Sequence, residues 1–307
     1  MSKVRTIVFH QYGVPGEVAR VEGWEIASPG PGEVRVRMLA APINPADLNV
    51  MEGKYATLPE LPGVPGVEGV GVVEELGAGA DQLVVGDRVL LPHGVGTWRE
   101  AVTLPAESLH VVPPDVPTEQ AAMLKINPAT ALRMLEDFVR LEPGDWVVQN
   151  AANSGVGHAV IQLSRHKGLR TLNFVRRPEL IDTLLEAGAD AVLLDEGDRG
   201  EQIHGILGKD TIRLGLNAVG GESALRVARS LAPGGTIVTY GAMARQPLKI
   251  PNGMLIFGDL TWRGFWVSRW YRDGSTKEER STMFARLFAL AARRILHTPV
   301  ERIYPWD

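Results

Sequence analysis

Small residues, a helical segment and two arginines are grouped between Asp145 and Arg177 in a pattern that suits dinucleotide binding. The turn after the first apolar run reads Ala152-x-Ser154-x-x-Gly157, a degenerate form of the G-x-G-x-x-G fingerprint, with an additional Gly155. Small side chains let the backbone approach a pyrophosphate, and the N–H groups at the start of the next helix favour negative charge. The turn alone is equally compatible with an ordinary strand–helix–strand unit, so its context has to decide.

The residues at the end of the next apolar run indicate which cofactor this site binds. Leu169–Val175 has the length and branching of a buried parallel strand, and Arg176 and Arg177 follow it directly. A dinucleotide site usually carries Asp or Glu at this distance from the turn, for the ribose hydroxyls. A guanidinium group suits a 2′-phosphate and cannot accept a hydrogen bond from a hydroxyl. The pattern predicts NADP(H) rather than NAD(H); the alternative is a solvated basic pair before Pro178.

The chain offers few groups for metal or thiol chemistry. It contains no cysteine, which excludes disulfides, thiolate metal sites and a cysteine nucleophile. Its seven histidines are scattered and form no HxxxH-type pair, although His158 and His166 fall on the helix after the turn. We therefore expect no catalytic metal.

Two kinds of sequence texture surround these residues and must position them. Up to about residue 120, short β-rich runs alternate with Pro/Gly turns, which is typical of a compact barrel-like β domain. After Pro117, strands and helices alternate, which predicts an α/β fold with a doubly wound parallel sheet covered on both faces. The predicted domains are 1–120 and 121–268.

Composition and charge bound the possible partners. The chain has 307 residues and a mass of 33.3 kDa, which suits two domains, with a net charge of −4 and a pI near 6.0. This charge argues against a nucleic-acid or membrane-surface binder, and no apolar run is long enough to span a bilayer. The first residues lack the apolar core of a signal peptide. We expect a soluble cytoplasmic enzyme with a small-molecule substrate and with no nucleic-acid or membrane partner.

Several stretches resemble the medium-chain dehydrogenase/reductase superfamily. Gly66–Gly71 is similar to its GxExxG signature, and Gly86–Val89 matches its common GDxV turn. Other segments resemble one branch, the zinc-independent, NADPH-dependent trans-2-enoyl-thioester reductases of fatty acid synthesis. They span nearly the whole chain: Ile43–Asn49, Gly53–Tyr55, Gly96–Trp98, Asn127–Ala131, Gln149–Gly157, Thr239–Met243 and Arg263–Trp270. The resemblance implies a GroES-like β-rich substrate domain, a Rossmann nucleotide-binding domain and a return of residues 269–307 to the substrate domain.

The resemblance also implies reduction of the C=C bond of an acyl thioester carried on CoA or acyl-carrier protein. Hydride from NADPH enters the β-carbon, negative charge collects on the thioester oxygen as an enolate, and the α-carbon then needs a proton. Without a metal, a tyrosine hydroxyl or a backbone N–H must stabilise that oxygen. Tyr55 matches the family's catalytic tyrosine; the alternative is an aromatic ring that seals a loop. The family further implies a homodimer built through the edge strand Leu260–Trp266.

More residues are implied to bind the cofactor or the substrate. Besides the two arginines, the expected cofactor contacts are Asn127, Asn153, Ser154, Gly155, Val156, Tyr240, Gly241, Ala242, Met243, Phe265, Trp266 and Val267. Asn44 and Trp266 are expected in the substrate pocket. Asn127 is equally compatible with a helix N-cap before Pro128, and Phe265 and Trp266 with ordinary core burial. Asn44 and Val67 stand where zinc-dependent members carry metal ligands.

Two departures from the family pattern and two rival functions stay open. Lys125 stands where the family tends to have a small residue, and the chain ends at Asp307 before an expected helix and strand, so we expect a truncated substrate domain. A quinone oxidoreductase of the same superfamily shares the Asn44-Pro45 segment and the degenerate turn. A catalytically idle NADPH-binding protein is the alternative from a different class.

Overall fold

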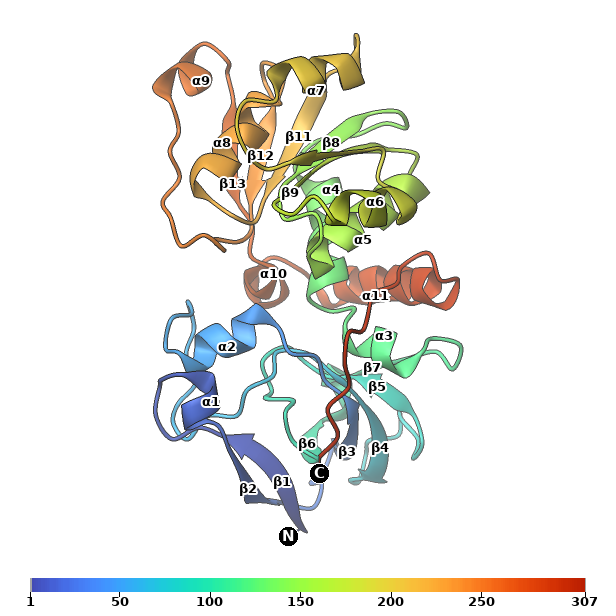
Figure 1. Cartoon of the computed structure of the whole chain (residues 1–307). Coiled ribbons are helices and arrows are strands. Elements are labelled where there is room, and N and C mark those ends of the chain that lie inside the picture. The colour runs from blue at the N-terminus through green and yellow to red at the C-terminus, as the bar shows by residue number, and fades with distance from the viewer. Residues whose placement is uncertain (1, 307) are drawn as a thin grey trace. The chain divides into compact units, whose positions relative to one another are not determined.

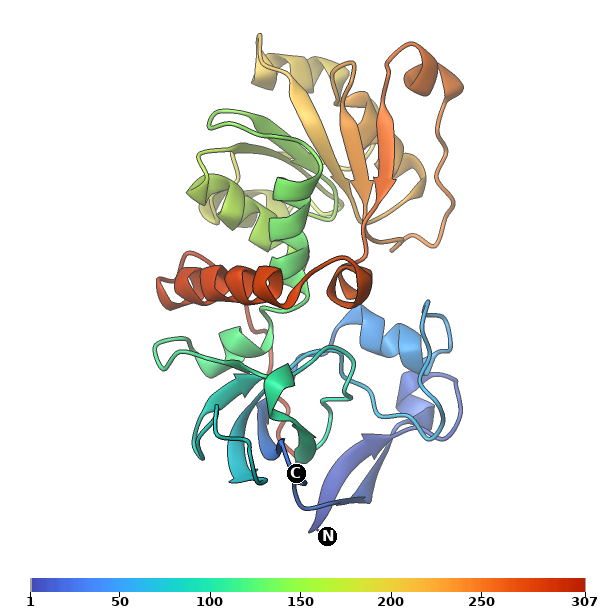
Figure 2. The same cartoon turned by 180° about the vertical axis from the view of Figure 1, so that it is seen from behind.

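The computed structural model describes residues 2–306, which form two compact units (Figures 1 and 2). The first unit comprises the residues up to Ile126, Tyr271–Arg294 and those from Val300 on; the second comprises Asn127–Trp270 and Ile295–Pro299. The sequence predicts domain boundaries near residues 120 and 268. In the structure, the chain passes from the first unit to the second at 126/127 and returns to the first at 270/271. No helix among the described residues is long and apolar enough to cross a membrane.

The second unit is built on a parallel sheet, whose strands fan out side by side in Figure 1. Within residues 2–306 it has six strands, in the order β10-β9-β8-β11-β12-β13. Their bounds are β8 Trp146–Gln149, β9 Arg170–Val175, β10 Ala191–Leu194, β11 Ile212–Asn217, β12 Thr236–Thr239 and β13 Thr261–Gly264. Numbered within the unit, this is the 3-2-1-4-5-6 order of dinucleotide-binding folds, which reverses between β8 and β11. The predicted doubly wound parallel sheet is confirmed.

Helices cover both faces of this sheet because successive residues of its buried strands point to opposite sides. On the side of Val175, α5 (Gly155–His166) and α6 (Leu180–Glu186) contribute apolar side chains to one core cluster. On the side of Phe174, α7 (Gly200–Leu207) and α8 (Gly221–Arg229) contribute to another. α4 (Asn127–Asp137) packs beside α5, and α9 (Asn252–Ile256) precedes β13. Each large buried apolar side chain contributes about 1.5–3 kcal/mol, so these clusters hold the strand ends in place.

The first unit contains an antiparallel sheet in the order β6-β3-β4-β5-β7 and a separate hairpin of β1 and β2. The strands are β1 Ser2–Val8, β2 Arg20–Ile26, β3 Glu33–Ala40, β4 Val70–Leu76, β5 Arg88–Leu90, β6 Ala101–Pro105 and β7 His110–Val111. Its helical segments are α1 (Pro15–Val18), α2 (Pro45–Met51), η1 (Ala106–Ser108), α3 (Thr118–Ala122) and α11 (Lys277–Ala292). The helix α10 (Val267–Asp273) contains the 270/271 boundary between the units. The inward side chains of Val34, Val36 and Val89 are fully buried, which confirms the predicted β-rich domain.

One element of the first unit has no counterpart among the sequence expectations. After Asn44 the chain forms the helix α2, and a turn that contains Gly53 connects this helix to Tyr55. Pro45 stands in the first turn of α2, where its missing N–H costs no hydrogen bond. A helix of seven residues is shorter than the window in which hydrophobic periodicity can be recognised, so the sequence pattern did not reveal it.

Candidate active site

The turn between β8 and α5 packs closely against the first residues of α5. Ser154 is the N-cap of α5, and its hydroxyl oxygen accepts a hydrogen bond from the Gly157 N–H at 3.1 Å. A side chain on residue 157 would collide with the Ala152 carbonyl oxygen, so glycine is required for the helix to pack against the turn. The first N–H groups of a helix have no partner within the helix, so the start of α5 suits an anionic ligand.

Asn127 and Tyr240 flank this turn inside the second unit. A Cβ on Gly155 would lie 2.7 Å from Asn127 Nδ2, so the missing side chain lets the asparagine approach the turn. Asn127 is the first residue of α4, which makes it part of the helix rather than an N-cap before it. The Tyr240 hydroxyl is buried beside Ser154, and this burial raises the pKa of Tyr240 above its ordinary value. The structure thus brings Asn127, Ser154, Gly155 and Tyr240 together.

The two arginines lie at the carboxyl edge of the same sheet. Arg176 and Arg177 directly follow β9, which pairs with β8, and both side chains are exposed. Arg177 Nε lies 3.6 Å from Glu179 Oε1, a solvent-exposed ion pair of small strength. Because the carboxyl ends of neighbouring parallel strands share an edge, the arginines and the turn after β8 occupy one side of the sheet, where this fold binds its ligands.

The predicted residues after β12 and β13 reach this edge as well. The Met243 N–H donates to the Ala218 carbonyl oxygen at 2.9 Å, which folds Gly241–Met243 back over the end of β11. After β13, the Phe265 N–H donates to Thr239 at 2.9 Å, and the Phe265 ring meets Phe138 edge-on with centroids 5.8 Å apart. Val267 is buried, whereas Met243 is 59% exposed.

Two buried asparagine side chains, Asn150 and Asn217, lie near the carboxyl ends of β8 and β11. The sequence analysis did not single them out. Asn150 Nδ2 donates to Asn217 Oδ1 and to Ser223 Oγ, each at 2.8 Å, and Asn150 Oδ1 accepts the Ala218 N–H at 2.7 Å. Asn217 Oδ1 also accepts the Gly220 N–H at 3.0 Å. This network ties β8 to β11 at the point where the strand order reverses. The signal for it is an amide side chain at the end of each of two apolar strands.

In the first unit, two buried carboxylates hold the head of α2. Asp47 accepts the Asn44 N–H at 2.7 Å and the Val67 N–H at 2.9 Å. Burial raises the pKa of Asp47 to about 6, and these backbone hydrogen bonds counteract the rise. Glu68 Oε1 accepts Asn44 Nδ2 at 2.9 Å. Asn44, predicted in the substrate pocket, is therefore a buried side chain with a fixed orientation.

Tyr55 follows the end of the same helix. The Gly53 N–H donates to Val50 and the Lys54 N–H to Asn49, which are the two bonds of a Schellman motif. Gly53 has a φ of +70°, a conformation that glycine adopts without strain. Tyr55 comes two residues later and is half-buried. The structure thus places Asn44 and Tyr55 at opposite ends of one short, anchored helix.

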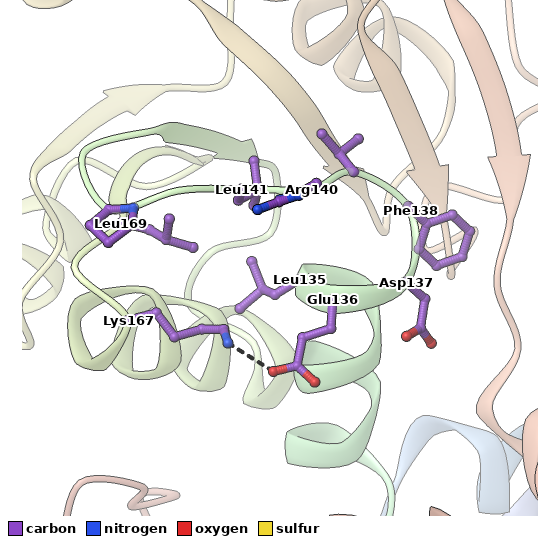
Figure 3. Close-up of a pocket in the computed structure, with 10 residues that line it drawn as sticks. Leu135, Glu136, Asp137, Phe138, Arg140, Leu141, Lys167 and Leu169 are labelled. Carbon is purple, nitrogen blue, oxygen red and sulfur yellow. Dashed lines mark hydrogen bonds and ion pairs between the residues drawn. The ribbon is translucent and has the colours of Figure 1, made fainter.

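A pocket of about 510 Å³ in the second unit lies elsewhere (Figure 3). It is lined by the end of α4, the segment before β8 and the end of α5, which puts it at the amino edge of the sheet. In Figure 3, Lys167 reaches across it to Glu136, with Nζ and Oε1 2.8 Å apart. None of the predicted site residues lines this pocket, so we do not assign it to the candidate site.

The acidic and histidine side chains of the described residues are dispersed. Within residues 2–306, no group of three or more His, Asp or Glu side chains is arranged to hold a metal ion. At the position that resembles a zinc ligand, Asn44 donates its amide to Glu68. That arrangement serves to hold the helix α2.

Comparisons with known proteins match both units. The alcohol dehydrogenase GroES-like domain family matches residues 30–114, and the zinc-binding dehydrogenase family matches residues 155–287. The mitochondrial enoyl-acyl-carrier-protein reductase of Bos taurus is 47% identical over 281 residues, which cover 89% of this chain and 75% of the bovine protein. The Xenopus tropicalis reductase of the same name is 43% identical and covers 99% of this chain and 89% of its own.

Solved structures share the whole fold. The Etr1p complex with NADP and crotonyl-CoA has a TM-score of 0.92 and 28% identity, covering 100% of this chain and 93% of its own. The Etr1p/Etr2p heterodimer of mitochondrial 2-enoyl thioester reductase from Candida tropicalis has a TM-score of 0.91 and 28% identity, covering 99% and 92%. The Escherichia coli quinone oxidoreductase complexed with NADPH has a TM-score of 0.85 and 26% identity, covering 96% and 90%.

These relatives correct one expectation. The sequence predicts a cytoplasmic protein, and this prediction is wrong, because the similar reductases from Bos taurus, Rattus norvegicus, Homo sapiens and Xenopus tropicalis are all mitochondrial proteins. The prediction depended on the absence of an apolar signal core in the first residues, and that absence does not discriminate between these compartments.

Proposed function

The chain belongs to the medium-chain dehydrogenase/reductase superfamily and to its enoyl-thioester reductases, and from this membership we propose that it reduces the C=C bond of trans-2-enoyl thioesters with NADPH. The observation that carries the proposal is the 47% identity, over 89% of this chain, to an enoyl-acyl-carrier-protein reductase. The solved relative that holds NADP together with crotonyl-CoA supports both the cofactor and the substrate class. The thioester is carried on CoA or on acyl-carrier protein.

The second unit has the features that a phosphorylated dinucleotide requires. The glycines at 155 and 157 leave room for backbone and for Asn127 beside the start of α5, which suits a pyrophosphate. Arg176 and Arg177 are exposed at the same edge and suit the 2′-phosphate. When bound, NADPH supplies the hydride for the β-carbon. The loops at 153–156, 240–243 and 265–267 contribute the remaining contacts.

We assign stabilisation of the enolate to Tyr55. As hydride reaches the β-carbon, negative charge develops on the thioester oxygen, and the Tyr55 hydroxyl donates a hydrogen bond to that oxygen. The anchored ends of α2 support this role, because a donor whose position is fixed before the reaction loses little free energy in reorganisation. The α-carbon then takes up a proton, which Tyr55 helps to supply, and Asn44 at the head of α2 helps to bind the substrate.

Steady-state turnover with alternative acceptors tests the function. We expect NADPH oxidation with crotonyl-CoA and longer trans-2-enoyl-CoA substrates to exceed turnover with quinones. Faster turnover with a quinone would favour the quinone oxidoreductase that the fold also resembles. Tight NADPH binding without consumption in the presence of any enoyl thioester, enal or quinone would indicate an idle binding protein.

We also propose a homodimer built through β13. This strand lies at the edge of the six-stranded sheet, and its residues Thr261, Arg263 and Gly264 are exposed. The backbone of an edge strand leaves donors and acceptors open on one side, where a second copy can extend the sheet. A solved relative is a heterodimer of two similar chains. Light scattering should give twice the chain mass of 33.3 kDa; the mass of a single chain contradicts the proposal.

A further inference from the structure

One buried carboxylate in the first unit holds two backbone segments that lead to proposed site residues. Glu68 precedes β4 and is fully buried, with 0% of its surface exposed. Its Oε1 accepts Asn44 Nδ2 and its Oε2 accepts the Ile126 N–H, each at 2.9 Å. Asn44 begins the helix that leads to Tyr55, and Ile126 directly precedes Asn127 in the chain. Each carboxylate oxygen therefore fixes a different segment.

A buried amine lies in the same cluster. Lys125 is 4% exposed, its Nζ donates to the Leu91 carbonyl oxygen, and it lies 5.5 Å from the centre of the Tyr271 ring. The Tyr271 hydroxyl donates in turn to the Lys125 carbonyl oxygen at 2.6 Å. A carbonyl oxygen and the face of an aromatic ring both stabilise a protonated amine. When it is protonated, Lys125 lowers the pKa of the Glu68 carboxyl through its charge.

We propose that Glu68 is a positioning residue for the enoyl reduction, that its two carboxylate oxygens fix the Asn44 side chain and the Ile126 N–H together, and that the charge of Lys125 favours the ionised form of this carboxylate. The inference rests on the proposed function. An ionised carboxylate accepts both N–H groups through charge-assisted hydrogen bonds. A protonated carboxyl turns one oxygen into a donor, which weakens the hold on one of the two segments. Glu68 acts through Asn44 and Ile126 without contact to the substrate.

The charged neighbours determine the pH at which this hold is lost. Burial raises the pKa of Glu68 to about 8; Asn44 and the Ile126 N–H lower it, Asp47 of α2 raises it and Lys125 lowers it. Burial lowers the pKa of Lys125 to about 7, Glu68 opposes this fall, and Arg280 of α11 adds to it. Because the pKa of Glu68 is raised, proton uptake on acidification begins well above the ordinary range of a glutamate. We therefore expect kcat to fall as the pH drops through that raised range.

Two histidines are also affected by the charge of this amine. Burial, and to a smaller extent the charge of Lys125, lower the pKa of His93, after β5, to about 4. Burial also lowers the pKa of His110 on β7 to about 4, with contributions from Lys125, Arg280 and Lys277. Both rings are neutral at the pH values at which Glu68 takes up its proton. Their own protonation therefore does not contribute to the expected fall of kcat in that pH range.

Glu68→Gln and Lys125→Met test the inference through the pH profile of kcat with crotonyl-CoA and NADPH. Glutamine has the same size, but its amide can accept only one of the two N–H groups. We expect kcat of Glu68→Gln to fall about 10-fold, because the loosened segments misplace the site residues. We also expect the fall of kcat at low pH to disappear from its pH profile. Lys125→Met removes the positive charge near Glu68, and the fall of kcat should then occur about one pH unit higher. Glu74→Gln, which breaks an exposed pair with Arg37 on the neighbouring strand, is the matched control and should change neither quantity.

Carbon-13 NMR of glutamate-labelled protein gives a readout that needs no activity. One side-chain carboxyl resonance should titrate above the ordinary glutamate range, be absent in Glu68→Gln and titrate higher in Lys125→Met. If the wild type reduces crotonyl-CoA but every carboxyl titrates in the ordinary range, or the variants keep the wild-type profile, the inference is overturned and the function stands. If the wild type does not reduce enoyl thioesters, the function fails, and the positioning role fails with it. If Glu68→Gln does not fold, the carboxyl titration and the pH profile of kcat in the wild type and in Lys125→Met still test the inference.

Discussion

Replacing Tyr55 by phenylalanine is expected to lower kcat for crotonyl-CoA by about 10²-fold, because loss of one donor at a developing oxyanion costs about 10²–10³ in kcat. The change removes only the hydroxyl and leaves the half-buried ring in place. The proposed cofactor contacts belong to the second unit, so the Kd for NADPH should be unchanged. Steady-state kinetics and a fluorescence titration with NADPH measure the two quantities separately.

Two other tyrosines of the first unit serve as controls for this experiment. The Tyr304 side chain is 66% exposed, and Tyr304→Phe should leave kcat unchanged. The Tyr12 hydroxyl donates to the Pro59 carbonyl oxygen at 2.7 Å, so Tyr12→Phe loosens the segment after Tyr55 without removing the proposed donor. A loss in Tyr12→Phe equal to that in Tyr55→Phe would attribute the effect to loop anchoring. Wild-type kcat in Tyr55→Phe would falsify the catalytic assignment.

Removing both Arg176 and Arg177 by alanine substitution is expected to lower the preference for NADPH over NADH by about 10²-fold, measured as the ratio of kcat/KM values. A hydrogen bond to a charged group contributes about 1.5–3 kcal/mol, and about 1.4 kcal/mol corresponds to a factor of ten. NADH lacks the 2′-phosphate, so its kcat/KM should change little. The loss for NADPH should also shrink at high salt, because both side chains are exposed.

A third arginine separates a specific contact from general charge. Arg140 is 91% exposed and precedes β8, so it lies at the amino edge of the sheet, away from the proposed phosphate site. Arg140→Ala should keep the wild-type cofactor preference. If the double variant uses NADPH and NADH in the wild-type ratio, the arginines have no part in cofactor selection, and another group must recognise the phosphate.

Local sequence patterns were sufficient for the architecture of the second unit. Several of its strands are rich in apolar residues, and the parallel sheet follows from the alternation of strands with helices. Ser154, Gly155 and Gly157 were recognised because each has a requirement within a few residues of itself: a helix cap, a close approach to Asn127 and a close approach to the turn. In the first unit the helix α2 was missed, because its stability depends on contacts from outside its own seven residues.

The sequence by itself therefore determined the fold class and was enough to predict the nucleotide turn and a phosphorylated cofactor, because hydrophobic periodicity, turn geometry and side-chain charge act over short distances along the chain. Only the tertiary structure decided what Glu68 and Lys125 do. Asn44 and Ile126 are far from Glu68 in the sequence, and their hydrogen bonds form only when the first unit folds. A carboxylate's partners and pKa depend on burial and on charges brought near it in space, and no local pattern encodes either.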